Sequence, residues 1–371
     1  MKEIQSILLD YLQTHHLMDK KIAIALSGGP DSMALYHAIK KIKIPDLVIH
    51  INHQMRDISN QEETELKGLL EADSVKFEII RLNKIDFSKG NIEDRLRCLR
   101  FEAFSEILNQ YGICNLLTGH QKNDAEETIF KRILEGSSIF NLTSFLQPGL
   151  RKDFTLHKPL IKIEKQKLCD ALTRENQFYF VDDTNQDNRY LRGKMRTEIF
   201  PFLNQSFGKN IEGKFYDFGI QLKEALDYID LNLSHLLEHV YTNSCGLFIP
   251  RAELSSFEMK WILSKLFKLH QITVSKDIFE KAIKVFEKGL SNKKFYFKPV
   301  TIHVERVGIF ILMKEIENIQ TVSSVVEHKK NSFIDFWLGK PYPYCKEKIP
   351  FFLRSFVIKK RFHDESFSIQ F

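Results

Sequence analysis

The chain lacks the sequence features of a secreted protein, a membrane protein or a protein stabilised by a structural metal ion. Its 371 residues include only five cysteines, which lie far apart and form no Cys-x-x-Cys pair. A disulfide framework or a structural zinc site is therefore not expected. No apolar run reaches the about 20 residues that span a membrane, and the start of the chain lacks a signal-peptide core. We expect a cytoplasmic protein with no membrane partner.

A strong charge of one sign is also absent. Lys and Arg number 54 against 48 Asp and Glu, which gives a formal net charge of +6. This mild excess is compatible with RNA binding but does not by itself indicate it. The length and a hydrophobic content of 43% suffice for two domains, or two and a small additional module.

The most informative segment runs from Lys21 to Tyr36. An apolar run at 22–26 is typical of a strand buried on both faces, and a helical pattern begins at Pro30. Between them stands Ser-Gly-Gly, where glycines allow an anion to approach the backbone and the helix N-terminus favours negative charge. The pattern predicts a phosphate-binding loop. It is not a Walker P-loop, because no Gly-Lys-Ser/Thr follows. The alternative is a tight turn, which a bare Gly-Gly would favour.

Strand and helix patterns alternate up to about residue 205. Strands are expected at 47–51, 75–82 and 114–118, and helices at 60–72, 91–111 and 123–135. This alternation predicts an α/β fold with a doubly wound parallel sheet. Ligands of such sheets bind at the carboxyl ends of the strands, where Ser27, His53 and His120 fall.

The pattern changes after Pro201. Helical stretches at 222–240, 254–269 and 278–286 precede short alternating runs at 295–297, 302–304 and 307–311. We expect a catalytic domain at 1–205 and a mainly helical domain at 215–313 that closes with a small sheet. Residues 314–330 resemble a linker, and 331–371 form a short aromatic and basic C-terminal module.

Two motifs offer cations to a phosphate or a base. His53 and Arg56 follow the second strand, and Arg97 and Arg100 share a face of the helix at 91–111, with Glu93 one turn before. Taken alone, the first pair is more often a solvated loop and the second a solvent-facing helix surface.

Acidic and basic side chains follow the last strand of the alternating region. Asp124 and Glu127 lie in the first turn of a helix that begins just after Gly119 and His120. Two carboxylates there can hold an ammonium group or Mg²⁺. The alternative is helix capping, with Asn123 or Asp124 as the cap. Further along, Arg192 and Arg196 follow an acidic cluster at 182–187 and suit phosphate contact.

Together these motifs resemble the tRNA(Ile)-lysidine synthases, a family of N-type ATP pyrophosphatases, or PP-loop enzymes. The resemblance covers residues 20–205 and, loosely, 215–313, which it implies to be a helical tRNA-binding domain. We expect this domain and the C-terminal module, residues 215–371, to contact the tRNA body. Two departures are Phe101, where Tyr is common, and Gly193, where Asn usually follows Arg192. The matching segments are Ser27–Ser32, His53 with Arg56, Glu93 with Arg97 and Arg100, Gly119 and His120 with Asp124 and Glu127, Lys158-Pro159-Leu160, and Asp183 and Asn185 with Arg192 and Arg196.

The resemblance implies an adenine nucleotide alpha hydrolase-like fold and a tRNA-modifying ligase. ATP would adenylate the C2 oxygen of the wobble cytidine of a CAU-anticodon tRNA(Ile). The ε-amine of free L-lysine would then displace AMP and leave lysidine, which changes decoding from AUG to AUA. ATP, Mg²⁺, lysine and tRNA(Ile) are the implied cofactors and partners, and a homodimer stays open.

Roles for particular residues also follow from the resemblance. Asp31 would assist with the metal or the activated intermediate, and Asp124 and Glu127 would bind the ammonium groups of lysine. Arg192 or Arg196 would stabilise charge on the α-phosphate. The ligands of Mg²⁺ are left open. The nucleotide would be held by Ser27, Gly28, Gly29, Pro30, Asp31, Ser32, His53, Arg56, Arg97, Arg100, Gly119 and His120.

Two alternatives remain at this point. Another PP-loop tRNA-modifying enzyme, such as a thiolase, would usually show the Cys-x-x-Cys pair that this chain lacks. A non-catalytic tRNA-binding protein with a relict ATP site would be favoured by an eroded loop, but Ser27–Ser32 is intact.

Overall fold

The computed structural model describes residues 1–54, 58–82, 92–151, 153–181, 191–243, 246–251, 254–272, 274–298, 300–305 and 308–312. Arg56, Asp183, Asn185, the side chain of Glu93 and the predicted module at 331–371 lie outside the described residues. The chain divides into two compact units, Met1–Ala225 and Leu226–Phe371. In the part that the structure describes, no helix combines the length and apolar character needed to cross a bilayer.

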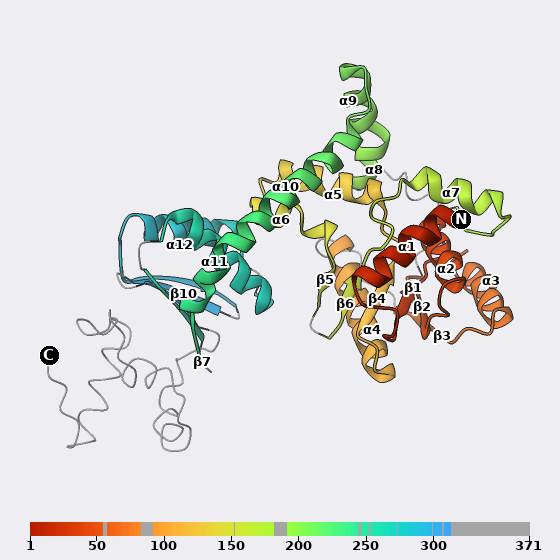
Figure 1. Cartoon of the computed structure of the whole chain (residues 1–371), viewed down its shortest axis with the longest axis horizontal. Helices are drawn as coiled ribbons and strands as arrows, with labels where there is room; N and C mark the ends of the chain where they lie inside the picture. The colour runs from red at the N-terminus through yellow and green to blue at the C-terminus, as the bar shows by residue number, and fades with distance from the viewer. Residues whose placement is uncertain are drawn as a thin grey trace. The chain divides into compact units, whose positions relative to one another are not determined.

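The first unit is built on a mostly parallel sheet (Figure 1). Among the described residues, six strands pair in the order β3-β2-β1-β4-β6-β5. Five of them are parallel neighbours, and β5 pairs antiparallel with β6. The doubly wound α/β fold predicted from the sequence is confirmed. The strands are β1 (Ala23–Ala25), β2 (Leu47–Asn52), β3 (Phe77–Arg81), β4 (Asn115–Thr118), β5 (Gly149–Leu150) and β6 (Thr155–His157).

The strand order reverses between β1 and β4. From β1 the chain passes through α2 (Pro30–Lys40), β2 and α3 (Ser59–Ala72) to β3, and α4 (Ile92–Tyr111) then returns it to β4 on the other side of β1. Open α/β sheets bind ligands outside the carboxyl ends of the strands at such a reversal. The loop that starts at Ser27 and the turn at Gly119 both lie at this point.

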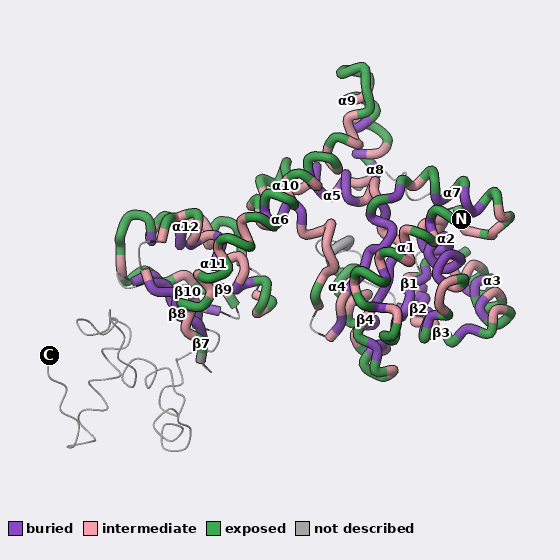
Figure 2. Tube along the Cα trace, in the orientation of Figure 1, coloured by how far each residue is buried: buried purple, intermediate pink, exposed green. Residues whose placement is uncertain are grey.

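Alternate strand residues pack into two separate cores. Ile24, Val48 and Leu117 lie in one core with apolar residues of α1 (Lys2–Thr14), α2, α3 and α7 (Lys165–Arg174). Ala23, Leu47 and Leu116 lie in the other, with α4. Figure 2 shows the buried strands between helices whose outer sides are exposed. Because both faces of the sheet are covered, its strands appear in the sequence as continuous apolar runs.

A helix with a π-helical turn follows the sheet. It consists of α8 (Leu191–Lys194), η3 (Met195–Ile199) and α9 (Phe200–Phe207). The N–H of Phe200 donates to the carbonyl of Met195, five residues back, and Pro201 has no N–H with which to resume the α pattern. Met195 and Phe200 pack on Phe130 of α5 (Lys122–Leu134). This packing places Arg196, in the π turn, beside α5.

The second unit contains an antiparallel sheet. Its described strands number five, in the order β7-β8-β11-β10-β9. Trp261 is almost fully buried, and its indole N–H donates to Asp230 Oδ1 at 2.7 Å. The sequence predicted the last three strands but neither β7 nor β8. The elements are α10 (Glu212–Leu233), which crosses the boundary between the units, η4 (Ser234–His239), β7 (Tyr241–Asn243), β8 (Gly246–Pro250), α11 (Ser256–Leu269), α12 (Lys276–Glu287), β9 (Lys293–Phe297), β10 (Val300–Glu305) and β11 (Gly308–Leu312).

The end of β4 approaches the start of α2 backbone to backbone. A Cβ atom built on Gly119 would lie 2.7 Å from both the carbonyl carbon of Asp31 and the amide nitrogen of Ser32. No side chain fits there unless the two segments move apart. Gly119 is therefore required by the close approach of the two loops at the switch point.

We predict that Gly119→Ala destabilises the protein by about 1–3 kcal/mol, because a methyl group overpacks this contact. Gly68→Ala is the matched control, since Gly68 lies exposed within α3 and its Cβ position has no neighbour within 4 Å. That change should stabilise the helix by about 0.5–1 kcal/mol. Denaturant unfolding measures both, and a Gly119→Ala protein as stable as the parent would contradict the close contact.

Candidate active site

The loop at 27–32 is closed by its two serines. The backbone N–H of Ser27 donates to Ser32 Oγ at 3.2 Å, and the Ser32 hydroxyl donates to the carbonyl of Gly29 at 3.0 Å. Since the one hydroxyl hydrogen of Ser32 is used, the Ser27 hydroxyl donates to Ser32 Oγ at 3.0 Å. Gly29 is the N-cap of α2 and Pro30 its first residue. The result is the strand–turn–helix geometry that binds phosphate.

Gly28 is held from a segment that the sequence did not point to. Its φ is +84°, in the left-handed region, and its carbonyl accepts the N–H of Phe180 at 2.9 Å. A Cβ at Gly28 would lie 2.3 Å from a ring carbon of Phe180. Phe180 thus covers the loop, and no pattern around position 180 signals this long-range contact.

Asp31 lies in the first turn of α2 and faces α5. Its Oδ1 is buried and has no hydrogen-bond partner among the described residues. Burial, and then the charge of Asp124, raise the pKa of Asp31 to about 7, although Lys165 and Arg196 oppose this. The loop and the acids of α5, which the sequence motifs assign to the site separately, therefore lie close together. Lys165, the first residue of α7, is a further charged neighbour that sequence reasoning missed.

The start of α5 differs from the expected cap. Gln121, not Asn123 or Asp124, is the N-cap: its side chain accepts the N–H of Asn123 at 2.6 Å, and Asp124 Oδ2 accepts the N–H of Gln121 at 3.1 Å. Asn123 Oδ1 instead accepts the N–H of Lys165 at 3.1 Å and joins α5 to α7. The expectation was wrong because several adjacent polar residues can cap, and tertiary contacts decide among them.

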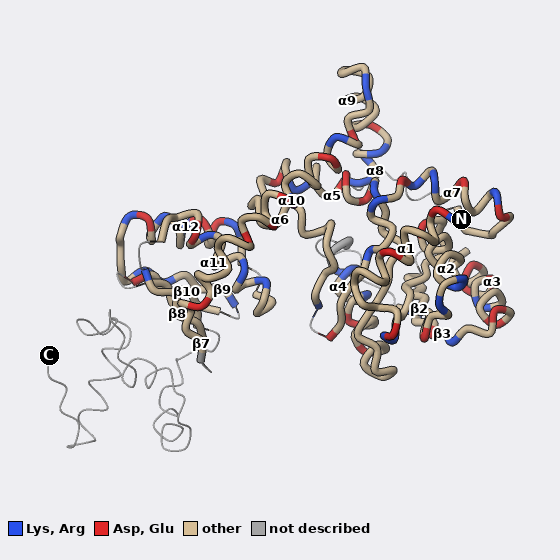
Figure 3. The backbone as a smooth tube through the Cα atoms, in the orientation of Figure 1, with Lys and Arg blue, Asp and Glu red and all other residues tan. Residues whose placement is uncertain are grey.

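Glu127 holds an arginine. Arg196 Nε lies 2.5 Å from Glu127 Oε1 and its Nη2 lies 3.1 Å from Oε2, while Arg192 Nε lies 3.8 Å from Oε2. Burial raises the pKa of Glu127, and the hydrogen bond from Arg196 opposes this. Arg196 also lies 3.7 Å from Asp124 Oδ1. All of these side chains were predicted to be site residues, and the structure brings them together. Figure 3 shows the Lys and Arg positions on α8.

His120 is held neutral at the end of β4. The Thr118 hydroxyl donates to the carbonyl of His157 at 3.1 Å, so it accepts the Nδ1–H of His120 at 2.7 Å. This hydrogen-bond pattern assigns Nε2 as the acceptor nitrogen of the ring. Burial lowers the pKa of His120 to about 4, against the charge of Asp124.

The second histidine, His53, follows β2. Burial and then the charge of Arg100 lower the pKa of His53 to about 4. The charge of Arg100 also contributes to the lowered pKa of His120. Arg100 therefore lies near the strand ends, and its role in binding the nucleotide stays a prediction. The charge of Arg97, three residues earlier, instead contributes to the lowered pKa of Arg132 and of Arg151.

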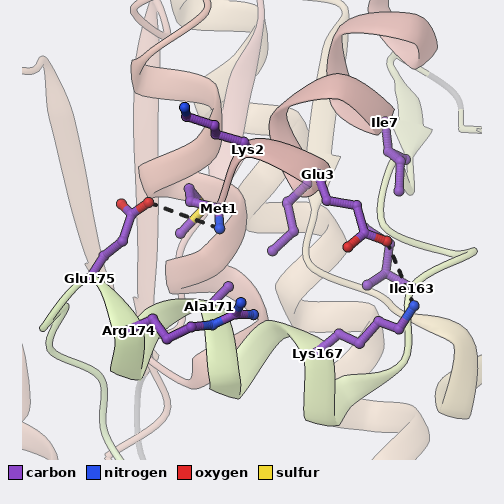
Figure 4. A pocket seen from close by; sticks show the side chains of 10 residues that line it. Met1, Lys2, Glu3, Ile7, Ile163, Lys167, Ala171, Arg174 and Glu175 are labelled. Atoms are coloured by element: carbon purple, nitrogen blue, oxygen red, sulfur yellow. Dashed lines mark ion pairs between the residues drawn. The ribbon is translucent and has the colours of Figure 1, made fainter.

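A groove of about 490 Å³ lies elsewhere, between α1 and α7 (Figure 4). The Met1 amino group lies 3.9 Å from Glu175, and Lys167 lies 3.6 Å from Glu3. None of the residues predicted to bind nucleotide lines it. The strand ends, which carry Asp31, His53 and His120 with their shifted pKa values, are the candidate site.

The residues at the strand ends suit Mg²⁺ bound together with a polyphosphate. Among the described residues, no group of three or more His, Cys, Asp or Glu side chains could hold a metal alone. Mg²⁺ at such sites needs only one or two carboxylates, because phosphates and waters supply the remaining ligands. Asp31 fits this role, since a cation would satisfy its buried oxygen and relieve its repulsion from Asp124.

The fold and the loop define the class of protein. Residues 2–203 match the family model described as a PP-loop domain. Curated relatives named tRNA(Ile)-lysidine synthase include one from Chlamydia muridarum, 32% identical over 267 residues that cover 70% of this chain and 83% of that one. Another, from Chlamydia trachomatis serovar D, is 30% identical over 296 residues, 79% of this chain and 92% of that one. The chain belongs to the tRNA(Ile)-lysidine synthase family of ATP-using, tRNA-modifying enzymes.

We predict that Asp31→Asn reduces the loss of stability with rising pH. Because the folded-state pKa of Asp31 is raised to about 7, the folded protein keeps a proton that the unfolded chain releases near its ordinary pKa. The stability contributed by this carboxyl is present below about pH 4 and is lost as the pH rises towards about 7. The variant should therefore be more stable than the parent at about pH 8 and similar at about pH 4.

Thermal unfolding across this pH range measures the effect. Asp10→Asn, on the exposed side of α1, removes a carboxyl of the same type and should leave the pH dependence unchanged. Parallel curves for Asp31→Asn and the parent would show that Asp31 ionises normally.

Proposed function

We propose that this chain joins free lysine to the wobble cytidine of a CAU-anticodon tRNA(Ile). ATP adenylates the C2 oxygen of the base and releases pyrophosphate; the ε-amine of lysine then attacks C2, AMP departs, and lysidine carries the new carbon–nitrogen bond. Decoding changes from AUG to AUA. The observation that carries the proposal is the meeting of a phosphate loop with Asp31, Asp124 and Glu127 at one switch point. The names of the relatives support it.

The loop at 27–32 is the proposed holder of the departing pyrophosphate. Its backbone N–H groups and the N-terminus of α2 favour a negative charge that grows as the bond breaks. His53, His120 and Arg100 would line the remainder of the nucleotide site. Neutral histidines suit this role because they supply hydrogen bonds without another charge. Mg²⁺, held by Asp31 and the phosphates, would supply charge neutralisation.

Asp124 is the proposed partner of the lysine ammonium. It lies beside Asp31 and keeps Oδ1 within 3.7 Å of Arg196, so its charge is only partly satisfied. Opposite charge within about 4–6 Å favours a protonated amine. Glu127, the other residue predicted to bind lysine, would act mainly through Arg196, because both of its oxygens engage that guanidinium.

Arg192 and Arg196 are proposed to stabilise charge on the α-phosphate. Arg196 is fixed by its bidentate pair, which gives a preorganised donor at little entropic cost. Arg192 is the more exposed of the two, with 43% of its side chain accessible against 31% for Arg196. The proposed substrates also support the cytoplasmic location expected from the sequence.

The decisive experiment incubates the protein with ATP, Mg²⁺, labelled lysine and either tRNA(Ile) with a CAU anticodon or the methionine tRNA. We expect pyrophosphate release and a lysine-bearing cytidine with the first tRNA only. Asp31→Ala should abolish both products in a protein that still folds. Pyrophosphate without lysine incorporation would favour another PP-loop enzyme, and tRNA binding without pyrophosphate a non-catalytic protein.

We predict that Asp124→Asn and Glu127→Gln impair different steps of the reaction. Asp124→Asn should raise the KM for lysine roughly tenfold to a hundredfold, because a charge-assisted contact contributes about 1.5–3 kcal/mol. Glu127→Gln releases Arg196 and should also slow pyrophosphate formation. Glu135→Gln, exposed at the far end of α5, is the control. An unchanged lysine KM with impaired ATP binding in Asp124→Asn would assign that carboxylate to the metal.

A further inference from the structure

The first unit carries a second cationic surface beside the strand ends. The guanidinium carbons of Arg97, Arg100 and Arg151 lie 5.6, 5.9 and 4.5 Å from the centre of the Phe101 ring. Arg97, Arg100 and Phe101 come from α4, and Arg151 follows β5. We call Arg97, Phe101, Arg132 and Arg151 the Phe101 patch.

Arg132 reaches this patch from α5. Its Nη1 donates to the carbonyls of Asn141 and Leu142, at 2.6 and 3.2 Å, and to Ser144 Oγ at 3.0 Å. These acceptors belong to α6 (Ile139–Leu142) and η1 (Ser144–Leu146). The guanidinium is therefore anchored by neutral hydrogen-bond acceptors, and the charge of Glu135 opposes the effects of burial and of Arg97 on it.

Like charges face one another across the patch. Burial, followed by the charge of Arg97, lowers the pKa of both Arg132 and Arg151, and only Glu135 opposes this at Arg132. Arginine does not lose its proton in proteins, so the repulsion persists in the folded chain. Arg151 Nε is also buried without a hydrogen-bond partner in the described part of the chain. A bound anion would relieve the repulsion and satisfy this donor.

The patch adjoins the site at the strand ends. Arg100 lies over the Phe101 ring, and its charge also lowers the pKa of His53 and of His120. The His120 ring meets the Phe145 ring edge-on at 5.4 Å, and Lys158 lies 5.1 Å from the centre of the Phe145 ring. Cationic side chains and aromatic rings therefore lie next to one another from His120 to the Phe101 patch. Arginine side chains contact the phosphates of nucleic acids, and aromatic rings and guanidinium planes stack on unpaired RNA bases.

We propose that Arg97 and Arg151, which lie over the Phe101 ring, together with Arg132, which the charge of Arg97 reaches, bind phosphodiester groups of the RNA substrate next to the nucleotide that is modified. This inference rests on the proposed function, because it takes the RNA from that reaction. It moves Arg97 from the nucleotide-binding set to RNA binding and adds Arg132 and Arg151. It also gives the catalytic unit its own hold on tRNA, apart from residues 215–371, which we expected to contact the tRNA body.

The test uses the full chain with Arg97→Gln and Arg151→Gln, singly and together. Lys131→Gln is the matched control: it removes one positive charge from α5 next to Arg132, at a side chain that lies 3.8 Å from Glu135. Arg132 is left unchanged because it supports the carbonyls of α6. The affinities for a CAU anticodon stem–loop RNA and for ATP are measured over a range of salt concentrations.

Each arginine variant should bind the RNA about tenfold more weakly, as expected when one charge-assisted hydrogen bond is removed. The slope of log affinity against log salt should become shallower by about 0.7–0.9 for each phosphate that the variant no longer neutralises. The affinity for ATP should stay at the parent value, and Lys131→Gln should change neither. If Arg151→Gln does not fold, the exposed Arg97 decides the outcome.

Weaker ATP binding with unchanged RNA binding would return Arg97 to the nucleotide site and overturn the inference. Unchanged binding of both ligands would overturn it as well. RNA affinity is measured without turnover, so this outcome is separate from that of the lysine incorporation assay. A parent chain that binds RNA through the patch yet forms no lysidine would refute the proposed reaction alone.

Discussion

The close backbone approach of Gly119 to Asp31 and Ser32 determines the geometry of the candidate site. Because no Cβ separates the end of β4 from the start of α2, the helix that follows β4 begins directly opposite the phosphate loop. Asp124, in the first turn of α5, is thereby brought to Asp31, and their repulsion contributes to the raised pKa of Asp31. The unfavourable charge pair is thus a consequence of a packing constraint between two backbone segments.

Cations from later elements offset this repulsion. Lys165 comes from α7, whose first N–H is capped by Asn123 of α5, and Arg196 comes from the π turn η3. The bidentate pair of Arg196 with buried Glu127 is a weak source of stability but a strong constraint on orientation, because removing either partner leaves a buried charge. Pro201 and the packing of Phe200 on Phe130 hold that turn against α5.

Local pattern predicted the fold and most of the site, and contacts between distant segments account for the remainder. The apolar run at 22–26, the glycines after it and the alternation of elements each follow from short-range rules. Two hydrogen bonds depend on tertiary packing that no local pattern encodes: the N–H of Phe180 to the carbonyl of Gly28, and the N–H of Lys165 to Asn123 Oδ1. Arg97 and Arg100 were expected to act together, but residues three apart on a helix are about 60° apart around its axis. That offset lets Arg100 face the histidines while Arg97 faces Arg132 and Arg151.

Charge is segregated around the strand ends, and this segregation bears on how substrates are oriented. Carboxylates gather where α2 and α5 begin, whereas Arg100, Lys158 and the Phe101 patch occupy α4, the later part of α5 and the segments after β5 and β6. A cationic amine is attracted by the carboxylates of the first region and repelled by the second, and the phosphodiester chain of an RNA is attracted by the second. The proposed reaction needs an amine to meet a base that is attached to a phosphodiester chain. Separate regions of opposite sign let both substrates bind without competing for the same side chains, which supports one productive orientation of the RNA relative to lysine.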